Sequence, residues 1–236
     1  MRSLGETMKL TALLLTIGVG LAGAFWFGLV PQSYSPFPPI SLEQRPGWFV
    51  DLRLAMLRFD SDLCRSVLKA PHIDAAPVAE VPIRNGCGLI NGVRFSSAGG
   101  VRLGVDKITC EMAATLTLWI EHEVQPAAVA RFGKRVSSIE DMGTYDCRNI
   151  VGNTFFAHRR SQHATANAID IAGFTLEDGR RISVLKDWKG KGAEAQFLRD
   201  IHASACHYFR VALGPEYNES HKNHFHLDRG LGWICR

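Results

Sequence analysis

The sequence predicts an α+β fold in which helices flank a small antiparallel sheet, with a transmembrane helix at the N-terminal end. Three observations support this prediction. Residues 10–30 form a long uncharged apolar run, two later segments repeat apolar residues at helical spacing, and several short segments alternate apolar and polar residues as strands do. Helices packed around a small antiparallel sheet define the α+β class.

The apolar run at residues 10–30 is the expected membrane anchor, which makes residues 1–30 the first unit of the chain. At about 1.5 Å per helical residue, its length matches a hydrocarbon core of about 30 Å. Arg2 and Lys9 precede the run, so the positive-inside rule leaves the N-terminus in the cytoplasm and exports the remainder. Residues 22–24 (Ala-Gly-Ala) also fit a cleavage site, which leaves a cleaved signal peptide as the alternative.

A proline-rich spacer at residues 31–47 and one folded domain at residues 48–236 are expected to follow the anchor. The frequent prolines make the spacer stiff and extended. The formal net charge is only +4 and no run of five or more like charges occurs, so nothing in the sequence supports binding to nucleic acid.

Six cysteines lie beyond the anchor, and none belongs to a Cys-x-x-Cys pair. An even number in an exported domain indicates disulfides, and the spacing argues against a cysteine-bound structural zinc. Spacing does not determine the pairing. Our working hypothesis is the sequential one: Cys64–Cys87, Cys110–Cys147 and Cys206–Cys235.

Two helices of the domain are predicted from apolar periodicity. The first spans residues 106–132, with Asp106 as its N-cap, a break near Pro126 and Gly133 as its stop. The second spans residues 193–213 and ends at the Gly-Pro pair that follows.

The strands of the sheet are predicted from alternation and turn residues. Short strands are expected at residues 92–95 and 100–103, and a hairpin at residues 166–185 around the turn Glu177-Asp178-Gly179. A last strand is expected at residues 224–228.

Two histidines lie in this last predicted strand. Because side chains alternate across a strand, His224 and His226 share one face, while Phe225 and Leu227 point to the core. Two buried neutral imidazoles need several hydrogen-bond partners, and a metal ion supplies one of them directly. An exposed strand face that carries two histidines by chance is the alternative.

A second segment supplies further candidate ligands. His163 and Asp170 are seven residues apart, so a loop leads from the histidine into the strand that carries the aspartate. Catalytic zinc commonly takes three ligands from His and carboxylate side chains and leaves a fourth position for water. His163, Asp170 and one histidine of the later pair meet that count.

The order of these motifs, Ser-x-His, then Ala-x-Asp, then His-x-His, resembles the zinc D-alanyl-D-alanine and lysostaphin-type peptidases, which include the penicillin-insensitive murein endopeptidases. The resemblance implies that His163, Asp170 and His226 bind zinc, with His221 and His224 as two further site histidines. That peptidase pattern has glycine where this chain has Ala166, and glycine permits a positive φ.

A closer resemblance, from Cys64 to Cys235, is to the bacterial extensin-like C-terminal domain family. It rests on residues 144–148 (Thr-Tyr-Asp-Cys-Arg), the block from His163 to Asp170, residues 213–215 (Leu-Gly-Pro) and residues 221–228.

The peptidase resemblance and the predicted anchor together imply a zinc metallopeptidase of the cell envelope. We expect a single-pass inner-membrane protein whose domain faces the periplasm and hydrolyses peptide bonds in peptidoglycan stem peptides or cross-links. Two other hypotheses stay open: a cell-wall-binding module that keeps zinc without turnover, and a disulfide-rich structural domain without metal.

Roles for the neighbouring residues follow from this hypothesis. His224 lies two residues from a ligand on the same face and is the expected general base, because an unperturbed imidazole has a pKa of about 6.5. His221 is expected to orient substrate or share the proton. The peptidase resemblance implies an arginine near the oxyanion, for which Arg148 is the candidate. Asp228 either holds a ligand imidazole in its tautomer or caps the strand.

Overall fold

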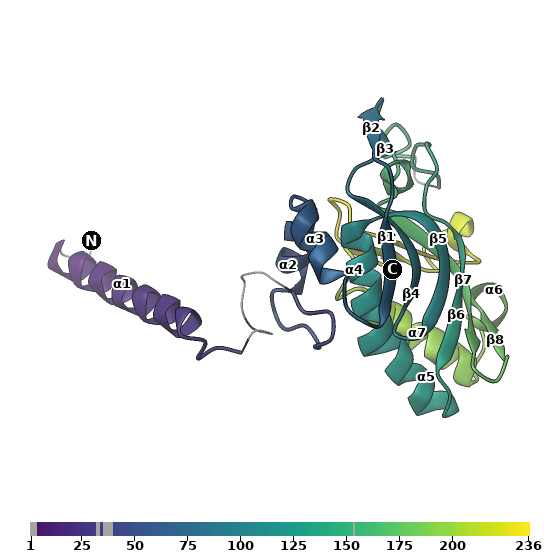
Figure 1. The fold of residues 1–236 in the computed structure, drawn as a ribbon, viewed down its shortest axis with the longest axis horizontal. Coiled ribbons are helices and arrows are strands. Elements are labelled where there is room, and N and C mark those ends of the chain that lie inside the picture. Colours follow the sequence, from purple (N-terminus) through teal and green to yellow (C-terminus); the bar gives the residue numbers. More distant parts are fainter. Residues whose placement is uncertain (1–3, 32–33, 35–39, 153) are drawn as a thin grey trace.

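A nine-stranded sheet forms the centre of the fold (Figure 1). The computed structural model describes residues 4–31, 34, 40–152 and 154–236. The sheet consists of β1 (Ile73–Pro77), β4 (Gly92–Ala98), β5 (Val101–Thr109), β6 (Val136–Gly143), β7 (Ala168–Leu176), β8 (Arg181–Ser183), β9 (Val211–Leu213), β10 (Phe225–Asp228) and β11 (Ile234–Cys235).

The strand order corrects the predicted size and type of the sheet. The strands lie in the order β1-β4-β5-β6-β7-β10-β9-β11, with β8 paired to β7. The mixed α+β class is confirmed, but the sheet is larger than expected, and the pairs β5–β6 and β9–β11 are parallel. The predicted hairpin is β7–β8, whose turn contains Gly179 at a φ of 85°.

A small separate hairpin projects beyond the sheet. It consists of β2 (Val81–Arg84) and β3 (Cys87–Leu89), joined at Asn85 and Gly86. Both turn residues have positive φ, 49° and 77°, as the tight turns that match the twist of paired strands require.

The N-terminal helix α1 (Leu4–Trp26) is long and apolar enough, over Gly5–Trp26, to cross a membrane. Part of the predicted spacer, residues 32–33 and 35–39, lies outside the described residues. Ile40 and Leu42, from the same predicted spacer, pack in the hydrophobic core. Two short helices follow, α2 (Val50–Leu57) and α3 (Ser61–Val67).

The first predicted helix of the domain forms as one continuous helix with a short π-helical segment in its middle. It comprises α4 (Cys110–Trp119), a π-helical segment η2 (Ile120–Val124) and α5 (Gln125–Phe132), and Gly133 ends it in the left-handed conformation as predicted. Pro126 does not break this helix. Since proline cannot donate a backbone hydrogen bond, the carbonyl of His122 instead lies 3.5 Å from Arg45 Nη2.

The start of this continuous helix differs from the prediction. Thr109 is the N-cap, because its hydroxyl accepts a hydrogen bond from the backbone N–H of Met112 at 3.4 Å. Asp106, the predicted cap, lies within β5. The alternating residues before Thr109 pair with β4, so the strand extends further than its apolar pattern indicated.

The second predicted helix is shorter than expected. Helix α7 (Ala193–Ala205) ends before a turn, and residues 211–213 form β9, which pairs with β10 and β11. Apolar residues at helical spacing continue through this segment, but their backbone N–H and C=O groups form hydrogen bonds in the sheet and not within a helix. Periodicity alone does not distinguish these outcomes for a short apolar run.

The disulfides correct two of the three predicted pairs. The structure has Cys64–Cys110, Cys87–Cys147 and Cys206–Cys235, so only the last predicted pair is confirmed. Cys64 lies on α3, which packs against α4 where Cys110 begins that helix. Cys87 lies on the projecting hairpin, away from α3. Pairing therefore follows contacts between elements that sequence order does not reveal.

A buried cluster of charges joins α2 to the segment after β10. The guanidinium of Arg229 is fully buried and donates to Glu111 Oε1 at 3.0 Å and to Asp51 Oδ1 at 2.7 Å. Arg210 binds both oxygens of Asp51 at 3.0 Å, and Arg58 donates to Glu111 Oε2 at 2.8 Å. Sequence reasoning did not identify this cluster.

Removal of the central cation from this cluster has a predictable cost. We expect Arg229→Met to lower the free energy of unfolding by about 3 kcal/mol, because Asp51 and Glu111 lose a buried partner. The control is Arg131→Met, which removes a surface pair with Asp200 and should cost at most about 1 kcal/mol. Urea unfolding of the full chain in detergent, followed by circular dichroism, measures both; equal losses would contradict this account of the cluster.

Candidate metal centre

The register of β7 and β10 brings two predicted ligands together. The strands are antiparallel, and His226 pairs directly with Asp170. Their neighbours Ile171 and Phe225 belong to the hydrophobic core. Because side chains alternate across a strand, Asp170 and His226 point to the face of the sheet away from that core.

His163 reaches the same point from a short turn, η3 (Gln162–Thr165), just before β7. The hydroxyl of Ser161 accepts a hydrogen bond from the backbone N–H of His163 at 3.3 Å and so caps the turn. Ala166 ends it in the left-handed conformation, at a φ of 51°. The chain therefore adopts at Ala166 the positive φ that glycine would permit, although Ala166 carries a Cβ.

The three predicted ligands converge within the described residues. His163 Nε2 lies 3.2 Å from both His226 Nδ1 and Asp170 Oδ1, and His226 Nδ1 lies 2.9 Å from Asp170 Oδ1. Atoms bound to a tetrahedral zinc ion at 2.0–2.1 Å would lie about 3.3 Å apart. The triangle of donor atoms is therefore close to one face of a zinc tetrahedron.

Hydrogen bonds on the outer side of each imidazole determine which nitrogen faces this centre. His163 Nδ1 lies 3.3 Å from the carbonyl oxygen of Thr144, which can only accept, so Nδ1 carries the proton. His226 Nε2 lies 3.0 Å from Asp228 Oδ2 and donates to that carboxylate. In the neutral rings, both nitrogens that face the centre therefore carry lone pairs, as metal ligands do; when a ring is protonated, the same nitrogen donates to Asp170.

When both rings are neutral, three acceptors face one another at this separation, and a proton or a metal ion is needed between them. Burial alone would raise the pKa of Asp170, but hydrogen bonds from His163 and His226 outweigh it and hold that pKa far below its usual value. Burial lowers the pKa of His226, but hydrogen bonds to Asp170 and Asp228 outweigh it and raise the pKa to about 9. Either a proton or a metal ion satisfies the centre, and the donor set fits Zn²⁺.

Asp228 makes the hydrogen bond that each of its two predicted roles would need. Its Oδ2 accepts from His226 Nε2, and its Oδ1 accepts from the backbone N–H of Gly230 at 2.7 Å. The second bond fixes the chain just after β10 and so holds the carboxylate in place behind the imidazole.

Two further predicted histidines stand beside the centre. His221 ends the short turn η4 (Glu219–His221), and its Nδ1 lies 2.7 Å from Asn218 Oδ1. His224 lies just before β10 rather than within it, with Nδ1 3.0 Å from Asn223 Oδ1 and Nε2 3.6 Å from Asp170 Oδ1.

Both of these histidines have a lowered pKa, which favours the neutral ring. Burial, followed by the neighbouring His226 and His224, lowers the pKa of His221 to about 4. Burial also lowers the pKa of His224, against the opposing effect of Asp170. With Nδ1–H donated to an asparagine oxygen, each ring keeps Nε2 as an acceptor.

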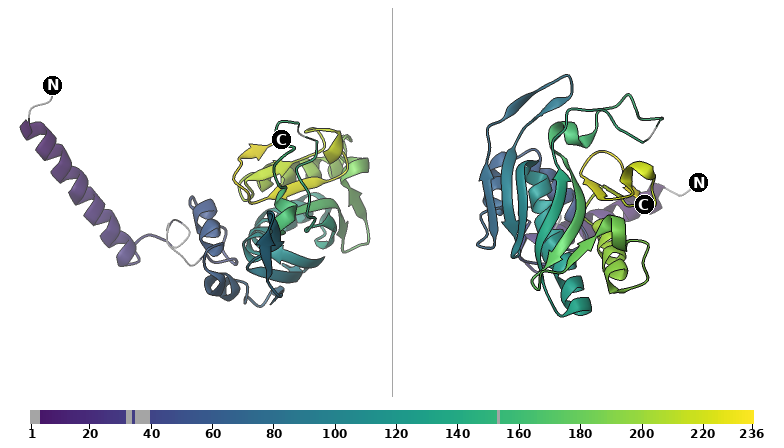
Figure 2. Two further views of the ribbon diagram at one scale, coloured as in Figure 1. Left: turned by 90° about the horizontal axis from the view of Figure 1, so that it is seen from above. Right: turned by 90° about the vertical axis from the view of Figure 1, so that its right-hand side faces the viewer.

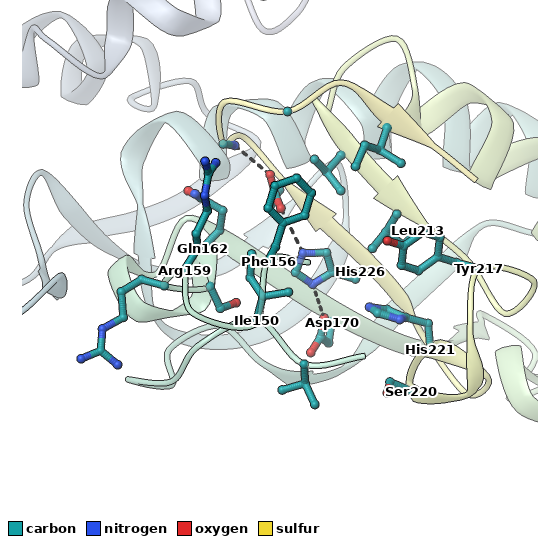
Figure 3. Close-up of a pocket in the computed structure, with 18 of the residues that line it drawn as sticks. Ile150, Phe156, Arg159, Gln162, Asp170, Leu213, Tyr217, Ser220, His221 and His226 are labelled. Atoms are coloured by element: carbon teal, nitrogen blue, oxygen red, sulfur yellow. Dashed lines mark hydrogen bonds and ion pairs between the residues drawn. The ribbon is translucent and has the colours of Figure 1, made fainter. Parts of the chain in front are cut away.

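A cavity of about 610 Å³ opens over the centre. Figure 3 shows His221 and Tyr217 on one side of Asp170 and His226, and Ile150, Phe156 and Arg159 on the other. Apolar side chains make up much of the remaining wall: Val151, Val211, Leu213, Leu231 and Ile234. Sequence reasoning did not identify these wall residues, because they come from separate loops and strands and share no motif.

Arg148 lines the same cavity. Its Nε lies 2.8 Å from Asp146 Oδ2, so it is already paired with a carboxylate. Its charge contributes to the lowered pKa of both His221 and His224. The disulfide Cys87–Cys147 ties the chain next to Arg148 to the projecting hairpin.

Comparison with known proteins identifies a family for most of the chain. The family described as extensin-like protein C-terminus matches residues 62–236. No curated protein and no solved structure matches the chain. The match includes every residue discussed at the centre, but no comparison links the chain to the zinc peptidases.

The left-handed conformation of Ala166 leads to a stability prediction. Replacement by glycine would remove a steric cost of about 1–2 kcal/mol from the folded state. It would also remove a buried methyl group and increase the entropy of the unfolded chain, which together destabilise the fold by about 1–2 kcal/mol. We therefore expect Ala166→Gly to unfold close to wild type.

The matched control for this prediction is Ala164→Gly, at a buried position of the same turn without positive φ. It should lose about 1–2 kcal/mol, because no relief of strain offsets the loss. Thermal unfolding of the full chain compares the two variants, and equal destabilisation would contradict the conformation of Ala166.

Proposed function

The chain belongs to the extensin-like protein C-terminus family, and we propose that it is a zinc-dependent peptidase of the cell envelope. The proposed substrates are peptide bonds in peptidoglycan stem peptides or cross-links, and the proposed location is the periplasmic side of the inner membrane. The observation that carries the proposal is the convergence of three possible ligand atoms, on His163, Asp170 and His226, at the base of a cavity.

His163 Nε2, Asp170 Oδ1 and His226 Nδ1 would hold the zinc ion. When bound, zinc supplies Lewis-acid polarisation of a carbonyl and lowers the pKa of a coordinated water. Asp228 and the carbonyl of Thr144 keep the two imidazoles in the tautomers that such binding requires.

His224 is the proposed general base. In its neutral form, Nε2 is an acceptor 3.6 Å from Asp170 Oδ1, and so lies at the edge of the centre where a water proton would be removed. His221 has its own asparagine partner and lines the cavity, where it would orient the substrate or take part in moving that proton.

Arg148 is proposed to stabilise negative charge that develops on the substrate carbonyl. Its guanidinium lines the cavity and donates to Asp146. This ion pair orients the guanidinium, but the carboxylate also offsets part of its positive charge. The apolar walls of the cavity would exclude water around the scissile bond and so strengthen the electrostatic interactions within it.

Metal content tests the ligand assignment. We expect the purified full chain to bind one Zn²⁺, and His163→Ala or His226→Ala to lose most of that affinity because only two ligands remain. His207→Ala is the control, since His207 is exposed and lies outside the cavity. Elemental analysis after dialysis gives the stoichiometry. Zinc retained in both ligand variants would refute the assignment, and no zinc in wild type would favour a metal-free structural domain.

Digestion of muropeptides tests the peptidase proposal. We expect wild type to cleave cross-linked or stem peptides, a chelator to stop cleavage, and His224→Ala to reduce kcat by about 10²–10⁴-fold with zinc content unchanged. Mass spectrometry of the products measures cleavage. If wild type binds zinc but cleaves no muropeptide, the chain is instead a zinc-containing wall-binding module, and peptidoglycan pull-down would then detect its ligand.

A further inference from the structure

Four exposed apolar side chains lie on and beside helix α2, and we refer to Trp48, Phe49, Leu52 and Phe59 as the α2 outer face. Their exposed fractions are 84%, 37%, 50% and 84%. The opposite side of the same helix places Leu54 and Leu57 in the core, where they are fully buried. Helix α2 is therefore apolar on both sides, although only one side is covered within the described chain.

The outer residues lie close together along the chain. Trp48 and Phe49 come just before the helix, Leu52 lies in its first turn, and Phe59 follows just after its end. Single exposed apolar residues are ordinary, but two aromatic side chains at 84% exposure within twelve positions, with Leu52 between them, form a patch.

The position of this patch in the chain indicates what covers it. Helix α1, the candidate membrane span, ends at Trp26, and residues 27–47 join it to Trp48. At about 3.5 Å per residue, this connection extends at most roughly 75 Å. The domain therefore stays near the bilayer that holds α1, at an effective concentration far above that of a free partner.

The arrangement of the helices agrees with this constraint. Figures 1 and 2 both show α2 and α3 on the side of the domain that is turned towards α1. Tyr34, from the connecting segment, packs edge-on against Trp48 with ring centroids 5.8 Å apart. The connection thus leads to the patch itself, not to the cavity side of the domain.

The chemistry of the patch fits the boundary of a bilayer. Tryptophan and tyrosine are enriched where headgroups meet acyl chains, since their rings are apolar with one polar edge. Leucine and phenylalanine on one side of a short helix bury in the same zone. Trp26 and Phe27, both exposed, place further aromatic rings at the end of the candidate span.

We propose that the α2 outer face inserts into the interfacial zone of the same bilayer that α1 spans. The domain would then rest on the membrane through Trp48, Leu52 and Phe59 instead of moving freely on its spacer. This proposal depends on α1 as a membrane span and is independent of zinc and of peptidase activity.

Fluorescence quenching of the full chain in vesicles tests this proposal. Bromine atoms on the acyl chains near the headgroups quench tryptophans that insert there. The difference between wild type and Trp48→Phe isolates the emission of Trp48, and we expect brominated lipid to quench it. Trp188→Phe provides the control, because Trp188 is only 7% exposed and packs against Phe225; its emission should be unchanged by brominated lipid.

Acrylamide, which quenches from water, completes the experiment. Trp48 should be protected from it in vesicles, and Leu52→Glu with Phe59→Glu should restore access. If Trp48 is open to acrylamide and insensitive to brominated lipid, the face is in water and the proposal is wrong. If neither agent quenches Trp48, a second copy or another protein covers the face, which also overturns the proposal.

Discussion

One electrostatic constraint determines the arrangement of the site: three lone pairs, on His163, Asp170 and His226, face one another within 3.2 Å. Like partial charges at that distance repel strongly where burial lowers the dielectric, so either a ring proton shared with Asp170 or a bound cation is needed between them. The register of β7 and β10 sets two of the three positions, and a slip of one residue would turn His226 towards the core. Hydrogen bonds to Thr144 and Asp228 then determine which nitrogen of each imidazole faces inward.

The same stretch of chain also takes part in the buried charge cluster. Asp228 contacts His226, while the next residue, Arg229, joins Asp51 and Glu111 in the buried charge cluster. A buried ion pair contributes little net stability, yet loss of one partner is costly. The cluster therefore favours the one arrangement in which every charge is paired. That arrangement also holds the end of β10, and with it the carboxylate behind the ligand imidazole.

The parts of the site that depend on local pattern were predictable from the sequence, and those that depend on tertiary contacts were not. Strand alternation and spacing selected His163, Asp170 and one histidine of the later pair, and the peptidase resemblance selected His226; the three side chains converge in the structure. The carbonyl of Thr144 has no signature, since any residue offers one. Periodicity failed at residues 211–213, where pairing with β10 replaced the helix, and cysteine order failed for Cys64 and Cys110 because helix packing decides which thiols meet.

Because Asp51 of α2 belongs to the buried charge cluster, the starting residue of a recombinant fragment matters. The family match begins at residue 62, but Asp51 binds Arg210 and Arg229, and Ile40 and Leu42 fill part of the core. A recombinant fragment trimmed to the matched segment would keep every candidate ligand and still lose these partners. If such a fragment bound no metal or cleaved no peptide, the cause would be misfolding. The result would then be mistaken for evidence against the proposed metal site or activity. Soluble fragments of this chain should therefore begin at or before residue 40.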